Sequence, residues 1–130
     1  MKIIILFARI LFSFIFIVSG MFHFSNMAIQ HGATFGVPMA SVIIPFSGLM
    51  AIVGSLLIIL GYKAKIGAWL IVAFLIPVTF TMHQFWTITD PMSRMIQMVM
   101  FEKNLSMLGG ALIITVFGSG AFSLDNKFKK

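Results

Sequence analysis

Four long apolar runs, separated by short polar segments, set the pattern of this chain. They cover about residues 3–22, 39–60, 66–87 and 102–122. Each run is close to the roughly 20 residues that an α-helix needs to cross the hydrocarbon core of a bilayer. The pattern therefore predicts an all-α protein, an integral membrane four-helix bundle that forms one transmembrane domain over residues 1–130.

A polar and amphipathic segment precedes the last run. Asp90-Pro91 is typical of a helix start, with the aspartate as the cap and the proline in the first turn. Apolar residues then follow on one helical face, and Arg94 and Gln97 lie on the other. This pattern predicts a short helix in the plane of the membrane interface before the last span begins at Glu102.

Composition supports a membrane environment and narrows the chemistry. The chain is 60% hydrophobic and 9% charged, whereas about a quarter of the residues of a soluble domain are charged. The net charge is +6, but the basic residues lie between the apolar runs, so we expect no nucleic-acid partner. Cysteine is absent from the sequence, which excludes thiolate metal sites and iron–sulfur clusters.

The basic residues also predict an orientation. One side of the membrane receives Lys2, Arg9, Lys63, Lys65, Lys127, Lys129 and Lys130, and the other receives Arg94 and Lys103. Because cytoplasmic segments carry the excess of lysine and arginine, both termini are expected in the cytoplasm.

Polar residues near the outer ends of three spans form the main candidate site. At 1.5 Å per residue, the following residues reach a similar depth: His23, His83, Gln84, Glu102, Lys103 and Asn104. One interpretation is a pocket for a quinone headgroup or another small amphipathic ligand, to which His83 and Lys103 donate hydrogen bonds. The other is an interfacial lock that fixes the helix register, because ionisable groups near a membrane usually face the bundle and pair.

A second pair of charges lies toward the cytoplasmic boundary. Arg9 on the first span and Asp125 after the last are predicted to form a structural ion pair. Haem bound by His23 and His83 and a metal ion at His23 and His31 are alternatives, but single scattered histidines favour neither. We therefore predict no metal site, and a quinone is the one cofactor considered.

Several stretches resemble the DoxX family of small four-span bacterial membrane proteins. They are Arg9 with Ser19-Gly20, Gly36-Val37-Pro38, residues 54–61, His83-Gln84-Phe85-Trp86, residues 101–105, Leu108-Gly109-Gly110 and Ser123-Leu124-Asp125. The resemblance implies a bundle in the bacterial inner membrane and an association with oxidoreductase systems. It marks Arg9, His83, Lys103, Asn104 and Asp125 as family-typical, while Ala51 and His23 replace a glutamate and a lysine of many relatives.

Together these observations favour an accessory subunit of DoxX type, without catalysis of its own. It would contact membrane lipid, associate with a protein partner or a second copy, and hold a quinone or lipid in the outer pocket. The alternative is a quinone-linked redox subunit using His83 and Lys103. A small-molecule transporter is a third possibility, although no continuous polar path links the two polar clusters.

Overall fold

The protein consists of helices joined by short connections. A computed structural model describes residues 2–128. In chain order the elements are α1 (Lys2–Phe22), α2 (Asn26–Thr34), α3 (Ala40–Leu60), α4 (Ala64–Met82), the 3-10 helix η1 (Phe85–Thr87), α5 (Pro91–Phe117) and α6 (Leu124–Phe128). Four of them, α1, α3, α4 and α5, are long and apolar enough to cross a membrane. The predicted fold class, an all-α four-helix membrane bundle, is confirmed.

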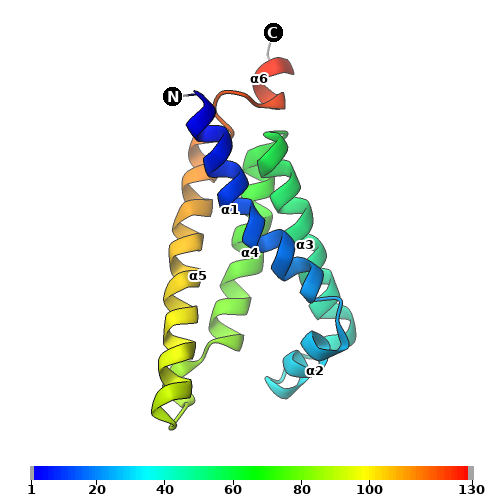
Figure 1. The fold of residues 1–130 in the computed structure, drawn as a ribbon. Helices are drawn as coiled ribbons and strands as arrows, with labels where there is room; N and C mark the ends of the chain where they lie inside the picture. The colour runs from blue at the N-terminus through cyan, green and yellow to red at the C-terminus, as the bar shows by residue number, and fades with distance from the viewer. Residues whose placement is uncertain (1, 129–130) are drawn as a thin grey trace.

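The four long helices contact one another in the order α1, α3, α4, α5. Figure 1 shows α5 running along one side of the bundle, while α1 crosses it diagonally, from beside α5 near the N-terminus toward α3 and α2. The core between them includes Phe16 of α1, Ile58 of α3, Leu75 of α4 and Ala111 of α5. The diagonal course of α1 is the feature that shapes the site described below.

Glycines bring neighbouring helices into close contact. A Cβ atom added to Gly20 of α1 would lie 2.7 Å from the carbonyl oxygen of Gly48 of α3. A Cβ atom added to Gly54 of α3 would lie 2.8 Å from the carbonyl oxygen of Gly67 of α4. Small residues allow such backbone contacts between membrane helices. Four small residues of α3 are buried accordingly, namely Gly48, Ala51, Gly54 and Ser55.

The helix before the last span is not a separate interfacial element, and that part of the prediction is wrong. α5 is continuous from Pro91 to Phe117. The sequence between them holds no further proline, so nothing interrupts the backbone hydrogen bonds. The predicted helix start is correct: the side chain of Asp90 accepts a hydrogen bond of 2.8 Å from the amide of Ser93. α5 ends before Gly118, whose φ of 74° lies outside the helical region.

The connection after α1 also differs from the expected loop. It contains α2, which begins after Ser25, whose hydroxyl oxygen accepts from the amide of Ala28 at 3.1 Å. α2 contacts α3, and its residue Gly32 packs against Ile44. This short helix therefore adds a wall at one end of the bundle.

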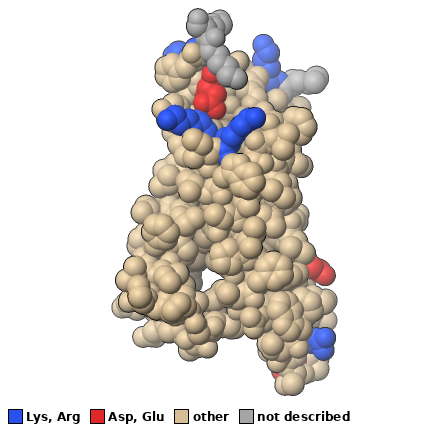
Figure 2. All heavy atoms as spheres, turned by 180° about the vertical axis from the view of Figure 1, so that it is seen from behind, with Lys and Arg blue, Asp and Glu red and all other residues tan. Residues whose placement is uncertain are grey.

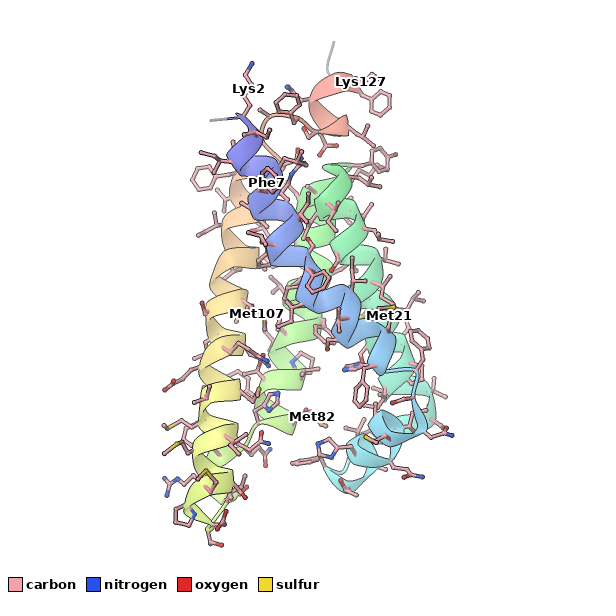
Figure 3. All side chains as sticks on the ribbon, viewed as in Figure 1. Lys2, Phe7, Met21, Met82, Met107 and Lys127 are labelled. Carbon is pink, nitrogen blue, oxygen red and sulfur yellow. The ribbon has the colours of Figure 1, made fainter. Side chains whose placement is uncertain are left out.

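The surface fits a membrane environment. Large apolar side chains are exposed on every long helix, among them Leu11, Phe46, Trp69 and Ile113. Figure 2 shows charged side chains toward the two ends of one face and an uncharged belt between them. Lys2 and Lys127 lie at the same end (Figure 3), whereas Lys129 and Lys130 fall outside the described residues. Lipid contact is plausible on this surface, and the expected protein partner or second copy stays a prediction.

Candidate functional site

A cavity of about 260 Å³ lies between α1, α4 and α5, at the end of the bundle near α2. α1 supplies Ile15, Phe16 and Ser19, and α4 and α5 supply apolar residues that include Met82 and Met107, which are labelled in Figure 3. Figure 2 shows an opening in the corresponding lower half of the molecule. The cavity therefore combines an apolar wall with access from outside.

Four of the six predicted site residues line this cavity, namely His23, His83, Lys103 and Asn104. Gln84 does not, because its side chain turns back to donate a hydrogen bond of 2.9 Å to the carbonyl of Phe80. Glu102 is exposed and lies outside the lining, since successive residues of a helix point about 100° apart. The structure therefore brings four of the six residues together and places the other two outside the lining.

His23 lies directly after the end of α1 and is held by α3. Its Nδ1 is 2.9 Å from the hydroxyl oxygen of Ser47, and that hydroxyl donates its proton to the carbonyl of Ile44 at 2.7 Å. The histidine must therefore donate through Nδ1, which leaves Nε2 as an acceptor in the neutral ring. Burial lowers the pKa of His23, so the ring is neutral at physiological pH.

His83 follows the last residue of α4 and links that helix to α5. Its Nδ1 lies 2.8 Å from the side-chain oxygen of Gln97. Because an amide oxygen only accepts, His83 donates through Nδ1. The bond joins two helices, as the lock interpretation required, but it leaves half of the ring's hydrogen-bonding capacity for the cavity.

Asn104 is the most informative residue of the lining. It is only 4% exposed, and within the described residues its carboxamide makes no hydrogen bond. Buried polar groups nearly always have a partner, and leaving one without costs about 1–3 kcal/mol. Its side chain borders the open cavity, so the carboxamide can form hydrogen bonds with a group inside that cavity.

The charge of the lining has one sign. Lys103 lines the cavity and is exposed, and its Nζ makes a weak contact of 3.3 Å with the sulfur of Met100. Among the described residues, no aspartate or glutamate lines the cavity. The lysine gives the wall a positive charge, which favours an anionic group.

Two polar residues of the lining, His31 and Ser19, were not among the predicted pocket residues. His31 comes from α2 and its ring contacts that of Phe35, with ring centroids 4.9 Å apart. It was missed because the segment was interpreted as a loop. Ser19 lies one turn before His23 on α1. The sequence contained a signal for Ser19, because Ser19 and His23 are four residues apart and therefore share a helical face.

Within residues 2–128 there is no group of three or more histidine, aspartate or glutamate side chains that could hold a metal ion. The side chains that line the cavity offer hydrogen bonds and a positive charge.

Arg9 and Asp125 lie at the opposite end. Arg9 is buried and its Nη2 donates to the carbonyl of Phe122. Asp125 accepts from the amides of Lys63 and Ala64 at 2.7 and 3.3 Å, which caps the start of α4. These bonds fasten the C-terminal segment to α1 and to the α3–α4 turn, and the direct ion pair between Arg9 and Asp125 stays a prediction.

Comparison with known proteins identifies relatives of the whole chain. A family model described as the SURF4 family matches residues 1–130. The inner membrane protein YphA of Escherichia coli (strain K12) is 30% identical over 129 residues, which are 96% of this chain and 90% of the relative. The inner membrane protein YqjF of the same organism is 29% identical over 128 residues, which are 97% and 92% of the two chains.

A eukaryotic relative matches a shorter stretch. The Surfeit locus protein 4 homolog of Drosophila melanogaster is 36% identical over 84 residues, which are 61% of this chain and 31% of the relative. No solved structure matches the chain.

These findings overturn the resemblance to the DoxX family. The interpretation as an oxidoreductase-associated accessory subunit, and the alternative of a quinone-linked redox subunit using His83 and Lys103, are wrong with it. The stretches that suggested the resemblance are helix ends, glycine contacts and interfacial polar residues, which many small membrane bundles need for packing. The protein is a multi-pass membrane protein with bacterial inner-membrane homologues, and the match over its full length shows that it belongs to the SURF4 family.

Proposed function

We propose that this chain is a membrane-embedded binding protein whose cavity holds a small organic anion. The observation that carries the proposal is the carboxamide of Asn104, which is buried beside the cavity and has no hydrogen-bond partner among the described residues. Such a group is stabilised when a ligand supplies the missing partner. We interpret the site as one of recognition, because its described lining offers hydrogen-bond donors and apolar surface.

The class of ligand follows from the donors and the walls. Lys103 and the amide nitrogen of Asn104 are hydrogen-bond donors suited to a carboxylate. Phe16, Leu75 and Met107 offer apolar surface to the rest of the molecule. The cavity volume of about 260 Å³ exceeds that of an engineered cavity of about 150 Å³ that accepts benzene. A carboxylic acid with a compact apolar body fits these requirements.

The proposal includes an orientation. Lys2 and Lys127 mark one end of the bundle, and the cavity lies at the other end, near α2. The positive-inside rule then puts the termini in the cytoplasm and opens the cavity toward the opposite side of the inner membrane. Ligands would reach the cavity from outside the cytoplasm.

Binding of short acids to the purified protein tests the proposal. Butanoate and benzoate should raise the thermal stability of the protein in detergent, and the neutral butanamide and benzamide should do so much less. Lys103→Gln should weaken binding of the acids by about tenfold or more, because hydrogen bonds to charged groups contribute about 1.5–3 kcal/mol. Lys65→Gln, at the other end of the bundle, is the matched control. Equal stabilisation by the acids and their amides, or unchanged binding in Lys103→Gln, would contradict the proposal.

A further inference from the structure

A second cavity lies on the other side of α4. It has a volume of about 390 Å³ and is bounded by α3, α4 and the segment 35–38. Its lining is nearly all apolar and includes Phe46, Met50 and Pro77. Its only side-chain hydroxyls are already used: Ser47 donates to the carbonyl of Ile44, and Thr81 donates to the carbonyl of Pro77 at 2.7 Å. This cavity therefore offers room for hydrocarbon and no unused side-chain donor.

The two cavities are direct neighbours. Phe74, Val78 and Met82 line both of them. The hydrogen bond between His23 and Ser47 completes the partition, because His23 lines the polar cavity and Ser47 lines the apolar one. The rings of His23 and Phe74 are 5.5 Å apart between centroids. The wall between the cavities is thus one layer of side chains.

One side chain of this wall can move at low cost. Phe74 is 4% exposed and belongs to the packed core, whereas Met82 is only partly buried at the end of α4, where Figure 3 labels it. Methionine is unbranched and has three rotatable bonds, so it adapts to neighbouring groups more readily than other apolar residues. A flexible chain that displaces Met82 would pass from the polar cavity into the apolar one.

We infer that the two cavities accept one ligand, a monocarboxylate with an unbranched aliphatic tail. This inference rests on the proposed function: the carboxylate lies beside Lys103 and Asn104, and the tail lies beyond Phe74 in the apolar cavity. By comparison with the roughly 150 Å³ that benzene needs, the apolar cavity of about 390 Å³ has room for most of an eight-carbon acid. The apolar part of the ligand is therefore linear instead of compact, and the apolar cavity is its binding site.

The chain-length dependence of binding tests this inference. Affinities of the purified protein for butanoate, hexanoate and octanoate are measured below the micelle-forming concentrations of the acids. Each added CH₂ group should tighten binding about fourfold, the equivalent of about 0.8 kcal/mol per buried CH₂. Ala73 lines the apolar cavity but not the polar one. Ala73→Phe should therefore abolish the increase in affinity with chain length and leave the affinity for butanoate unchanged. Ala8→Phe, at an exposed position of α1, is the matched control and should behave as the native protein does.

The outcomes separate this inference from the function on which it rests. If butanoate binds and Lys103→Gln weakens it, but octanoate binds no more tightly, the proposed function stands and the two-cavity site is wrong. The two-cavity site is also contradicted if Ala73→Phe retains the full increase in affinity with chain length, because the tail then lies elsewhere. If none of the three acids binds, both proposals fail.

Discussion

Replacing Asn104 by leucine should make the protein more stable and, at the same time, unable to bind its ligand. The carboxamide of Asn104 is buried next to a cavity and, in the described part of the chain, has no hydrogen-bond partner. Leucine has a similar volume and no polar atoms, so it fills the same space without an unmet hydrogen-bonding requirement. A residue kept for binding is expected to carry this kind of cost in the unliganded protein.

The size of the effect follows from the cost of the unpaired amide. A buried polar group without a partner costs about 1–3 kcal/mol, so Asn104→Leu should raise the free energy of unfolding by up to that amount. A gain of this size multiplies the folded-to-unfolded ratio by roughly 5–150, since about 1.4 kcal/mol corresponds to a factor of ten. Water that enters the open cavity would satisfy part of the requirement and bring the gain toward the lower value.

Equilibrium unfolding in mixed micelles measures this change. A denaturing detergent is titrated into the folded protein, and the fluorescence of Trp69 and Trp86 reports unfolding. Ser106→Leu, at an exposed position of the same helix, should change stability little. If Asn104→Leu instead destabilises the protein by more than 1 kcal/mol while Ser106→Leu is neutral, the amide has a structural partner and the argument for a binding site fails.

Substitutions at Gly54, Asp125 and His23, with controls at Gly109 and Asn126, test the packing, capping and pH dependence of the bundle. Gly54→Val should destabilise the bundle by about 1–3 kcal/mol, because its added Cβ would lie 2.8 Å from a backbone oxygen of α4; Gly109→Ala, with open space around the added atom, should stabilise it by about 0.5–1 kcal/mol. Asp125→Ala should cost about 0.5–2 kcal/mol in the same unfolding assay, because α4 loses its cap, while Asn126→Ala should cost little. Burial lowers the pKa of His23 below its ordinary value of 6.5, so the unfolded chain takes up a proton that the folded ring does not. Stability should therefore be full above about pH 6.5 and fall as the pH drops below it, and His23→Gln should remove this part of the pH dependence.

The sequence contains enough information for the fold class and for the depth of the site. Long uncharged runs admit few alternatives to spanning helices, and Asp90-Pro91 marks a helix start by its own hydrogen bond. Counting 1.5 Å per residue along antiparallel helices brought His23, His83 and Asn104 to the same level, and the structure joins them in one cavity. Depth is predictable because it depends only on helix length and direction.

Direction around the helix was harder to predict. α4 ends at Met82, so Gln84, which was expected inside the span over residues 66–87, lies beyond the helix. Polar residues at 102–104 suggested a break between two helices. A helix on the surface of a bundle can, however, continue through a charged segment when the charged side chains lie on its exposed face. α2 was missed because a nine-residue helix is set by its cap and by contacts with α3, which a local pattern does not contain.

The cavity itself follows from the path of α1 across the bundle. In the middle of α1, the ring of Phe12 packs against Gly110 of α5, and near the end of α1, Gly20 packs against Gly48 of α3. These contacts are eight residues apart, about 12 Å along the helix axis, and they join α1 to different neighbours. α1 must therefore diverge from α5 as it runs toward its C-terminal end, just before His23. This divergence leaves space over α4. Closely packed interiors leave few such spaces, and polar groups at Asn104 and His83 make collapse of this one unfavourable. The backbone contacts thus decide where the cavity lies, and the side chains of α5 decide what it can bind.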